Sequence, residues 1–370
     1  MDVALSERQE MIKQAARSFF QQECPRSTVR EIEASGAGYS AALWKKLAGL
    51  GWLGITYPKE FGGEEASLLD TAMVYEEMGR SLFPGPHLET VIIGGELILA
   101  LGTTAHRWEH LNKIREGELL VSVVLPDMDS SRDAGIVAEK SGAEWLLDGR
   151  AFVPYASIAN LLLCAAQTGA RRSDVTVFAL DPKSRGISIT PCHTMSGDNL
   201  CQVAFDNVAV PDARVVGEVG KAGPGLGRVV ERATVLHCAR MAGACEPILD
   251  MAVQYAKERV QFGKQIGQFQ GVQWLCVDIA SATHIASLLT RQAAWLIDNG
   301  EPHRAEVAAA KAYISDALQR AARSAHEVFA GVSFIVDHDL QLYTRRAKAW
   351  ETYFGDARRH RSTIAEALKL

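Results

Sequence analysis

The segment Arg259-Val260-Gln261-Phe262-Gly263-Lys264-Gln265-Ile266-Gly267-Gln268-Phe269-Gln270 joins two long amphipathic stretches of the chain. Before it, apolar residues recur at helical spacing at Met241, Ala244, Cys245, Ile248, Leu249, Ala252, Tyr255 and Ala256. After it, the pattern returns at Val272, Leu275, Cys276, Ile279 and Ala280. This spacing predicts two helices, each with one buried face, and Gly263 and Gly267 mark the turn between them.

The turn carries side chains that suit a charged ligand with a ring system. Arg259 presents a planar, permanently charged fork of donors that matches phosphate oxygens. Gln261 and Gln270 offer amide donors and acceptors, and Phe262 offers a flat apolar surface. A diphosphate attached to a ring system would satisfy all of these groups. The alternative is a well-capped helical hairpin with a surface arginine, because charged turns between helices are common.

Length and composition are those of an ordinary globular protein. The chain has 370 residues, of which 48% are hydrophobic and 22% charged, and this predicts two or three domains. The net charge of -5 gives no basic patch, so nucleic acid is not an expected partner. Apolar runs such as residues 159–166 are too short for a membrane span. Scattered cysteines without a Cys-x-x-C pair, and histidines without ligand spacing, predict a reducing cytoplasm and no metal site.

Three zones of the chain differ in pattern. Residues 1–117 have helical periodicity, which begins with the capping box Ser6-Glu7-Arg8-Gln9. Residues 118–217 contain β-prone runs at 119–125, 145–147, 161–163, 175–180 and 201–205, separated by turn residues. Residues 222–370 return to long helical patterns with little Gly or Pro. The sequence therefore predicts an α+β protein with a helical domain, a strand-rich domain and a second helical domain.

Several segments together carry a resemblance to a known family. They are Leu50-Gly51-Trp52-Leu53-Gly54-Ile55 with Pro58-Lys59-Glu60-Phe61-Gly62-Gly63, Glu76-Glu77-Met78-Gly79-Arg80, Phe205-Asp206-Asn207-Val208-Ala209-Val210-Pro211, and Tyr255-Ala256-Lys257-Glu258-Arg259-Val260-Gln261-Phe262-Gly263. On these segments the chain resembles the acyl-CoA dehydrogenase family over essentially its whole length. The resemblance implies an N-terminal helical domain, a middle β-barrel domain and a C-terminal four-helix bundle.

The resemblance also implies FAD as cofactor, an acyl-CoA thioester as substrate and an electron-transfer flavoprotein as partner. The positions that match the family's contacts to the FAD of a neighbouring subunit are Arg259, Gln261, Phe262, Gln270, Glu327, Val328 and Gly331. A cofactor shared in this way implies at least a dimer. In the segment from Glu327 to Gly331, Ala330 stands where the family has a glycine, and Glu327 stands where it has a glutamine. These changes add a methyl group and a negative charge near the dinucleotide.

The family's catalytic base has no clear counterpart. The family reaction needs a carboxylate within hydrogen-bond reach of the substrate's α carbon, while a hydride leaves the β carbon for the flavin. The three positions at which members carry this base are Phe354, Ala233 and Arg240 here. Asp356 is the candidate that remains, with a helix cap as the alternative. Glu231 requires a local gap in the match, and Glu246 is expected on a solvated face.

The segments that would surround the chain's own flavin depart as well. In the loop 125–131, Ser130 and Ser131 are the only substitutes for a hydroxyl that the family uses, and the flavin wall is Phe152-Val153-Pro154-Tyr155. We therefore expect one subunit of a heteromeric enzyme whose homologous partner supplies the catalytic Glu. The segments 338–343 and 354–356 resemble bacterial α2β2 members that act on steroid side chains.

Two other functions stay open at this point. A flavin oxidase or monooxygenase on the same fold is compatible with the missing base, because a monooxygenase needs no α-proton abstraction. A non-catalytic partner subunit that completes the FAD site of a paralogue would need no base at all. The acyl chain of the substrate is not determined by sequence spacing.

Overall fold

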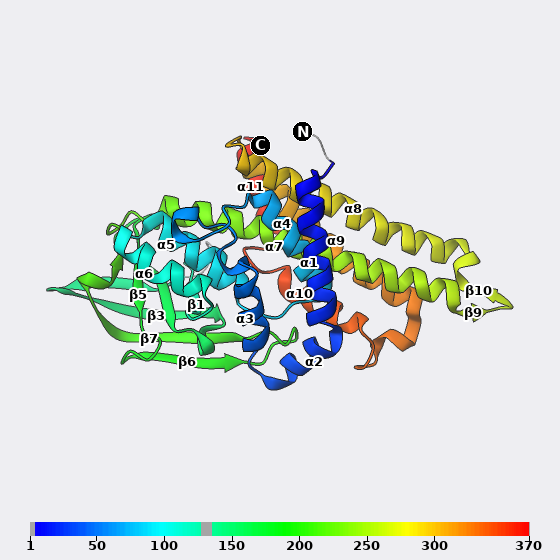
Figure 1. Cartoon of the computed structure of the whole chain (residues 1–370), viewed down its shortest axis with the longest axis horizontal. Helices are drawn as coiled ribbons and strands as arrows, with labels where there is room; N and C mark the ends of the chain where they lie inside the picture. The colour runs from blue at the N-terminus through cyan, green and yellow to red at the C-terminus, as the bar shows by residue number, and fades with distance from the viewer. Residues whose placement is uncertain (1–3, 127–134, 370) are drawn as a thin grey trace. The chain divides into compact units, whose positions relative to one another are not determined.

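The computed structural model describes residues 4–126 and 135–369 (Figure 1). The last helix before the strands ends at Arg115, the first strand begins at Val121, and long helices resume at Gly223. This order of helices, strands and helices confirms the predicted fold class. The first zone contains α1 (Glu7–Glu23), α2 (Arg26–Ser35), α3 (Ala41–Gly49), α4 (Leu68–Ser81), α5 (Gly95–Leu101) and α6 (Thr104–Arg115), with a π-helical turn at Leu88–Gly94.

The chain folds into two compact units that interleave along the sequence. One unit contains residues 1–30, 67–83 and 234–370, and the other contains residues 31–66 and 84–233. Helices α1 and α4 therefore belong with the C-terminal helices, although the sequence pattern groups them with their N-terminal neighbours. The boundaries predicted at 117, 118, 217 and 222 lie near the changes between helices and strands. As boundaries of domains they stay a prediction.

The second unit is built on one sheet with the strand order β6-β7-β3-β2-β4-β5-β8, and β1 pairs with β4. The strands are β1 (Val121–Val124), β2 (Val137–Ser141), β3 (Glu144–Pro154), β4 (Leu161–Gln167), β5 (Val175–Leu180), β6 (Ile187–Cys192), β7 (Leu200–Pro211) and β8 (Val215–Val216). The five predicted runs all lie on strands, whereas β2, β6 and β8 were missed. β2 and β6 are largely exposed, so they lack the apolar signal on which strand prediction depends.

The first unit is a helical bundle that also contains a small hairpin. Its C-terminal helices are α7 (Gly223–Glu258, shared with the other unit), α8 (Gln270–Asp298), α9 (Arg304–Phe329), α10 (Leu340–Trp350) and α11 (Ala357–Ala367), and the hairpin is β9 (Val260–Gln261) with β10 (Lys264–Gln265). The capping box predicted at Ser6 is present at the start of α1, where Ser6 and Gln9 cap each other.

Two glycines explain why α4 and α7 can pack closely. A Cβ atom at Gly79 would lie 1.7 Å from the carbonyl oxygen of Arg240, and one at Gly243 would lie 1.7 Å from that of Glu76. Any side chain at either position would collide with backbone, so the helices approach at distances that only glycine permits. The glycine of the Glu-Glu-Met-Gly-Arg motif, Gly79, is therefore required for the close packing of α4 on α7.

The two glutamates of the same motif are buried and paired. The Glu76 carboxylate accepts from Lys13 of α1 and Arg291 of α8, and the Glu77 carboxylate accepts from Arg17. Breaking a buried pair by removing one partner leaves an uncompensated charge and is strongly destabilising. These ion pairs hold α1, α4 and α8 together and position the bundle that carries the functional residues.

Candidate functional site

The segment from Arg259 to Gln270 forms a tight β-hairpin between α7 and α8, where the sequence predicted only a turn. Its central residues, Phe262 and Gly263, have φ angles of 50° and 77°. Two successive positive φ angles are typical of the type I′ turn, which matches the twist of the flanking strands. The conformation is unusual for phenylalanine, because positive φ is disfavoured for a bulky side chain. A one-turn 3-10 helix, Ile266–Gln268, then leads into α8.

The hairpin presents side chains that have no partner within the described part of the chain. The Arg259, Gln261 and Gln270 side chains are exposed and form no hydrogen bond or ion pair there. The Phe262 ring is 90% exposed, and its centroid lies 6.2 Å from that of Phe269. An exposed ring beside an unpaired guanidinium and free amides fits a ligand with an aromatic system and phosphate oxygens.

The second predicted contact segment lies where α9 ends. Glu327 is exposed and has no ion-pair partner among the described residues, whereas Val328 is buried. Ala330 follows the helix with φ 55° and ψ -143°. This conformation is close to a region that is essentially restricted to glycine. Ala330 therefore adopts a backbone conformation that favours glycine, the residue that the family has at this position.

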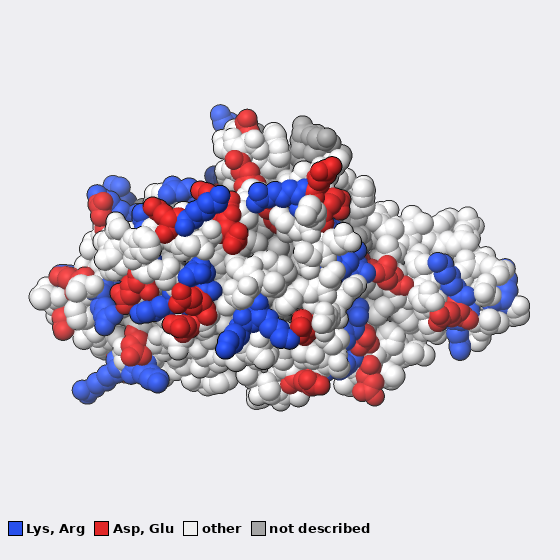
Figure 2. Space-filling model, viewed as in Figure 1, with Lys and Arg blue, Asp and Glu red and all other residues white. Residues whose placement is uncertain are grey.

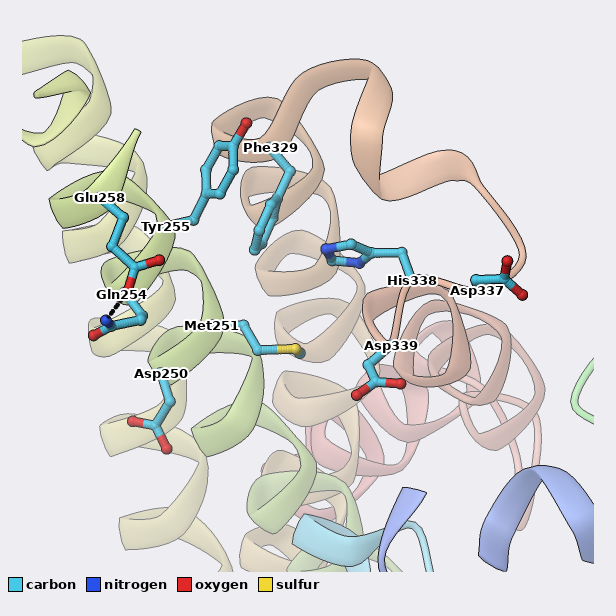
Figure 3. A pocket seen from close by; sticks show the side chains of 9 residues that line it. All are labelled: Asp250, Met251, Gln254, Tyr255, Glu258, Phe329, Asp337, His338 and Asp339. Carbon is cyan, nitrogen blue, oxygen red and sulfur yellow. Dashed lines mark hydrogen bonds between the residues drawn. The ribbon is translucent and has the colours of Figure 1, made fainter. Parts of the chain in front are cut away.

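A pocket joins the ends of α7 and α9, and no sequence pattern indicated it (Figure 3). Its volume is about 550 Å³, and its wall includes the Phe329 ring, whose centroid lies 4.5 Å from that of Tyr255 and 4.6 Å from that of His338. Tyr255 lies one helical turn before Arg259, and Phe329 lies within the second contact segment, so the contact between their rings brings both segments to one end of the bundle. The remaining lining residues are Asp250, Met251, Gln254, Glu258, Asp337 and Asp339.

The carboxylates of this pocket disfavour a phosphate inside it. Two of them are already paired, Asp250 with Arg80 and Asp339 with Arg30. Arg259, in the hairpin that follows α7, has no ion-pair partner among the described residues. The anion-binding function predicted for the hairpin therefore stays a prediction for the hairpin and not for the pocket.

The loop that carries the family's usual base position is tightly held. The Lys311 ammonium, which is fully buried, donates to the Ser315 hydroxyl and to the carbonyl oxygens of Glu351 and Gly355 at 2.8–2.9 Å. The His360 ring nitrogen Nε2 donates to the carbonyl oxygen of Phe354 at 2.9 Å. These bonds fix Phe354 at φ 59°, so a phenyl ring occupies the base position in a rigid loop.

Asp356 caps α11 in the structure. Its carboxylate accepts from the backbone N–H of Arg359 at 2.9 Å, which is the geometry of an N-cap. Asp356 therefore forms the helix cap that the sequence offered as the alternative to a catalytic base. A catalytic function for this residue stays a prediction.

The other positions considered for the base also lack a free carboxylate. Ala233 is fully buried on α7, and Arg240 contacts His237 and Trp350. The expectation that Glu246 lies on a solvated face was wrong, because its carboxylate pairs with Lys13, Arg17 and Arg80. Three cations from α1 and α4 converge on it, and sequence spacing within α7 contains no information about them. Glu231 is half-buried on α7.

Residues of the expected flavin wall lie at the end of β3. Phe152 is 66% exposed, and Pro154 has neither a hydroxyl nor a backbone N–H to offer a flavin. The Tyr155 hydroxyl accepts from the backbone N–H of Gly85 and is buried. Ser130 and Ser131 lie outside the described residues. The described part of the chain contains no group of three or more His, Cys, Asp or Glu side chains that could hold a metal ion.

Within residues 4–126 and 135–369, one helix, α8, is long and apolar enough in composition to cross a membrane, and 17% of its most apolar stretch is buried. The sequence expectation had considered only uninterrupted apolar runs. Polar residues within α8, such as Gln273, Asp278 and Thr283, interrupt the apolar runs. The mean hydropathy of the helix nevertheless stays high enough for a membrane span. The absence of a membrane span stays a prediction.

Comparison with known proteins agrees with the resemblance. Models of the acyl-CoA dehydrogenase N-terminal and C-terminal domains match residues 6–118 and 229–369. Acryloyl-CoA reductase (NADH) of Anaerotignum propionicum is 28% identical over 377 residues, which cover 99% of this chain and 95% of that protein. The two family models together span more than half of the chain.

Solved structures share the fold along the whole chain. A chain of the ChsE4-ChsE5 complex from Mycobacterium tuberculosis has a TM-score of 0.91 at 24% identity and covers 100% of this chain and 99% of its own length. Butyryl-CoA dehydrogenase from Megasphaera elsdenii has a TM-score of 0.90 at 24% identity, with 100% of both chains covered. FAD is the cofactor that follows from the family, and the unpartnered side chains of the hairpin fit it. The chain belongs to the acyl-CoA dehydrogenase family of oxidoreductases.

Proposed function

We propose that this chain is one subunit of a heteromeric, FAD-dependent acyl-CoA dehydrogenase whose homologous partner supplies the catalytic carboxylate. The observation that carries the proposal is a contrast within one unit. The hairpin offers Arg259, Gln261 and Phe262 to a ligand outside the chain, whereas Phe354 and Arg240 stand where a base is needed. The chain is equipped for a neighbour's cofactor and lacks an evident base of its own.

The chemistry explains why this contrast matters. Dehydrogenation of an acyl-CoA transfers the α proton to a carboxylate and a hydride from the β carbon to the flavin, and the electrons then pass to an electron-transfer flavoprotein. FAD accepts the hydride when it is bound. A phenyl ring at Phe354 has no lone pair that could accept the proton. In the proposed assembly, the Arg259 guanidinium neutralises the diphosphate of the partner's FAD, and Phe262 packs beside it.

The exposed face of α8 supports association with a partner subunit. Trp274, Val277 and Ile285 on this helix are 64%, 57% and 40% exposed. Asp278 is the only charged residue between Gln270 and Thr290, and Figure 2 shows a largely uncharged surface along the helix. Large exposed apolar faces mark interaction sites, so this face of α8 is suited to cover a subunit contact.

A test of the proposal is co-expression and co-purification with a homologous acyl-CoA dehydrogenase chain that carries the catalytic Glu. We expect the single chain to bind little FAD and the complex to contain about one FAD per two chains, measured by flavin absorbance against protein mass. The Phe262→Ala chain should lose FAD from the complex with little change in its own stability, because the ring is exposed. The matched control is Met195→Ala, which removes another exposed apolar side chain, 58% exposed, from the β-sheet unit.

Anaerobic titration with acyl-CoA separates the candidate functions. Bleaching of the flavin by the complex, lost when the partner's carboxylate is removed and retained in Asp356→Asn, is the expected result. A fully active, yellow protein from this single chain would overturn the heteromeric assembly. Loss of bleaching in Asp356→Asn would instead identify Asp356 as the base. A complex that holds FAD without bleaching would favour a monooxygenase, because that enzyme's flavin is not reduced by acyl-CoA.

A further inference from the structure

Arg240 is held in a fixed orientation on α7. Its guanidinium carbon lies 4.6 Å from the centroid of the Trp350 ring, so the planar group stacks on the indole. Its Nη2 donates to Nδ1 of His237, one turn earlier on the same helix, at 2.8 Å. The side chain is half-buried, and its Nε is buried without a hydrogen-bond partner among the described residues.

His237 explains how one edge of the guanidinium is positioned. Its Nε2 lies 2.8 Å from the carbonyl oxygen of Trp350, which can only accept a hydrogen bond, so Nε2 carries the proton. Nδ1 is then an acceptor, and it receives the Arg240 donor. Burial, with the charges of Arg240 and Lys311, holds the pKa of His237 well below its usual range. A neutral, fixed imidazole therefore orients Arg240 without neutralising it.

The Arg240 guanidinium is the charge of this cluster that lacks a carboxylate partner. No described carboxylate lies within ion-pair distance of it, whereas the carboxylates of Glu351 and Asp356 partly balance the charge of Lys311. Arginine cannot lose its proton in a protein, so its charge persists when it is partly removed from water. Unpaired, partly buried charges are unfavourable. An anion that reaches Arg240 would relieve this imbalance.

The same cluster contains the residues at the family's base position. The Phe354 and Tyr353 rings lie 5.7 and 5.5 Å from the His237 ring, centroid to centroid. By the resemblance, Phe354 stands where the family's base reaches the α carbon of the acyl group, so the acyl part of a ligand bound there would lie beside this cluster. A negative charge that meets Arg240 would therefore belong to the acyl part of the ligand.

We propose that Arg240 binds a carboxylate on the acyl group, so that the ligand class is an acyl-CoA with a second, terminal carboxylate. The inference rests on the proposed acyl-CoA function. The alternative is that Arg240 only packs on Trp350 and His237. Hydrogen bonds to charged groups are strong enough for the carboxylate to change affinity by about tenfold or more.

The experiment compares two probes of equal chain length, glutaryl-CoA and valeryl-CoA, which differ by one carboxylate. Affinities are measured by titration calorimetry on the chain together with its co-purified partner, so the readout does not depend on turnover. We expect glutaryl-CoA to bind about tenfold more tightly, and the preference to shrink as salt is raised. Arg240→Met should abolish the preference for glutaryl-CoA over valeryl-CoA, and Arg240→Lys should retain part of it.

Arg228→Met is the matched control, because Arg228 is an exposed arginine on the same helix. It should keep the preference for glutaryl-CoA. Equal affinity for the two probes, or a preference that survives in Arg240→Met, overturns the inference and leaves the acyl-CoA function standing. Failure of both probes to bind overturns the acyl-CoA function and this inference together.

Discussion

At the scale of single residues, the functional regions concentrate backbone conformations that are unusual for their side chains. Phe262, Ala330 and Phe354 all have positive φ, and each lies in a segment matched to a cofactor or base position. Strained residues persist only where the surroundings over-determine them, and they cluster at functional sites. The sequence identified these three positions through the resemblance, but it contained no sign of their backbone conformation.

Ala330→Gly tests whether strain is stored at the end of α9. We expect the free energy of unfolding to rise by about 1 kcal/mol, because relief of roughly 1–3 kcal/mol of strain exceeds the entropic cost of glycine. Urea denaturation measures the change. The control Ala309→Gly, within α9, should lower the stability by about 1 kcal/mol, since glycine is unfavourable inside a helix. Equal losses in both variants would show that Ala330 is not strained.

At the scale of elements, the connection between α7 and α8 shows where sequence reasoning stops. Helical periodicity on both sides correctly predicted α7 and α8, because the 3.6-residue repeat is a local property. The hairpin between them was missed, since Phe-Gly is not one of the Asn-Gly or Asp-Gly pairs that signal a type I′ turn. The pocket behind the hairpin was missed because Tyr255, Phe329 and His338 meet only through tertiary packing.

Val277→Glu tests the proposed interface on α8. A charge in the middle of this apolar face should prevent close association, because a buried, unpaired carboxylate is costly. We expect a smaller assembly mass by analytical ultracentrifugation, with the stability of the chain itself within about 0.5 kcal/mol of the parent. Thr190→Glu adds the same charge at an exposed position of β6, in the sheet unit rather than on α8, and should associate normally. An unchanged mass for Val277→Glu would place the interface elsewhere.

At the scale of the whole molecule, buried neutral histidines predict a loss of stability in acid. Burial lowers the pKa of His87 and of His360 to about 4, one residue in each compact unit. Between pH 6.5 and 4 the unfolded chain therefore binds protons that the folded chain excludes, and the free energy of unfolding falls as the pH falls. Each histidine contributes roughly 1 kcal/mol per pH unit in this window.

Urea denaturation between pH 7 and pH 4.5 measures this dependence. His87→Gln removes one titrating group and should flatten the curve below pH 6.5, even though it also lowers the stability at pH 7. His193→Gln, an exposed histidine on the sheet unit, is the control and should leave the slope unchanged. A His87→Gln curve parallel to that of the parent would contradict the assignment of a depressed pKa to this residue.

The sequence alone determined the order of secondary structure, the α+β class and the membership of a family. Periodicity, caps and motif residues are local features, so the cap at Ser6, the apolar stripes of α7 and α8 and the ligand-binding side chains expected at Arg259 to Gln270 could be predicted without coordinates. It also identified what is missing, because a phenylalanine at position 354 lacks a carboxylate in any fold.

Only the tertiary structure determined which residues surround Phe354, the position without a carboxylate. Lys311, His237 and Arg240 come from separate turns and helices, and their convergence beside Phe354 depends on how α7, α9 and α10 pack. Likewise, Glu246 is an ion-paired residue because α1 and α4 place three cations beside it. Charge pairing and burial are properties of distances in space, and spacing along one helix cannot encode contacts with another.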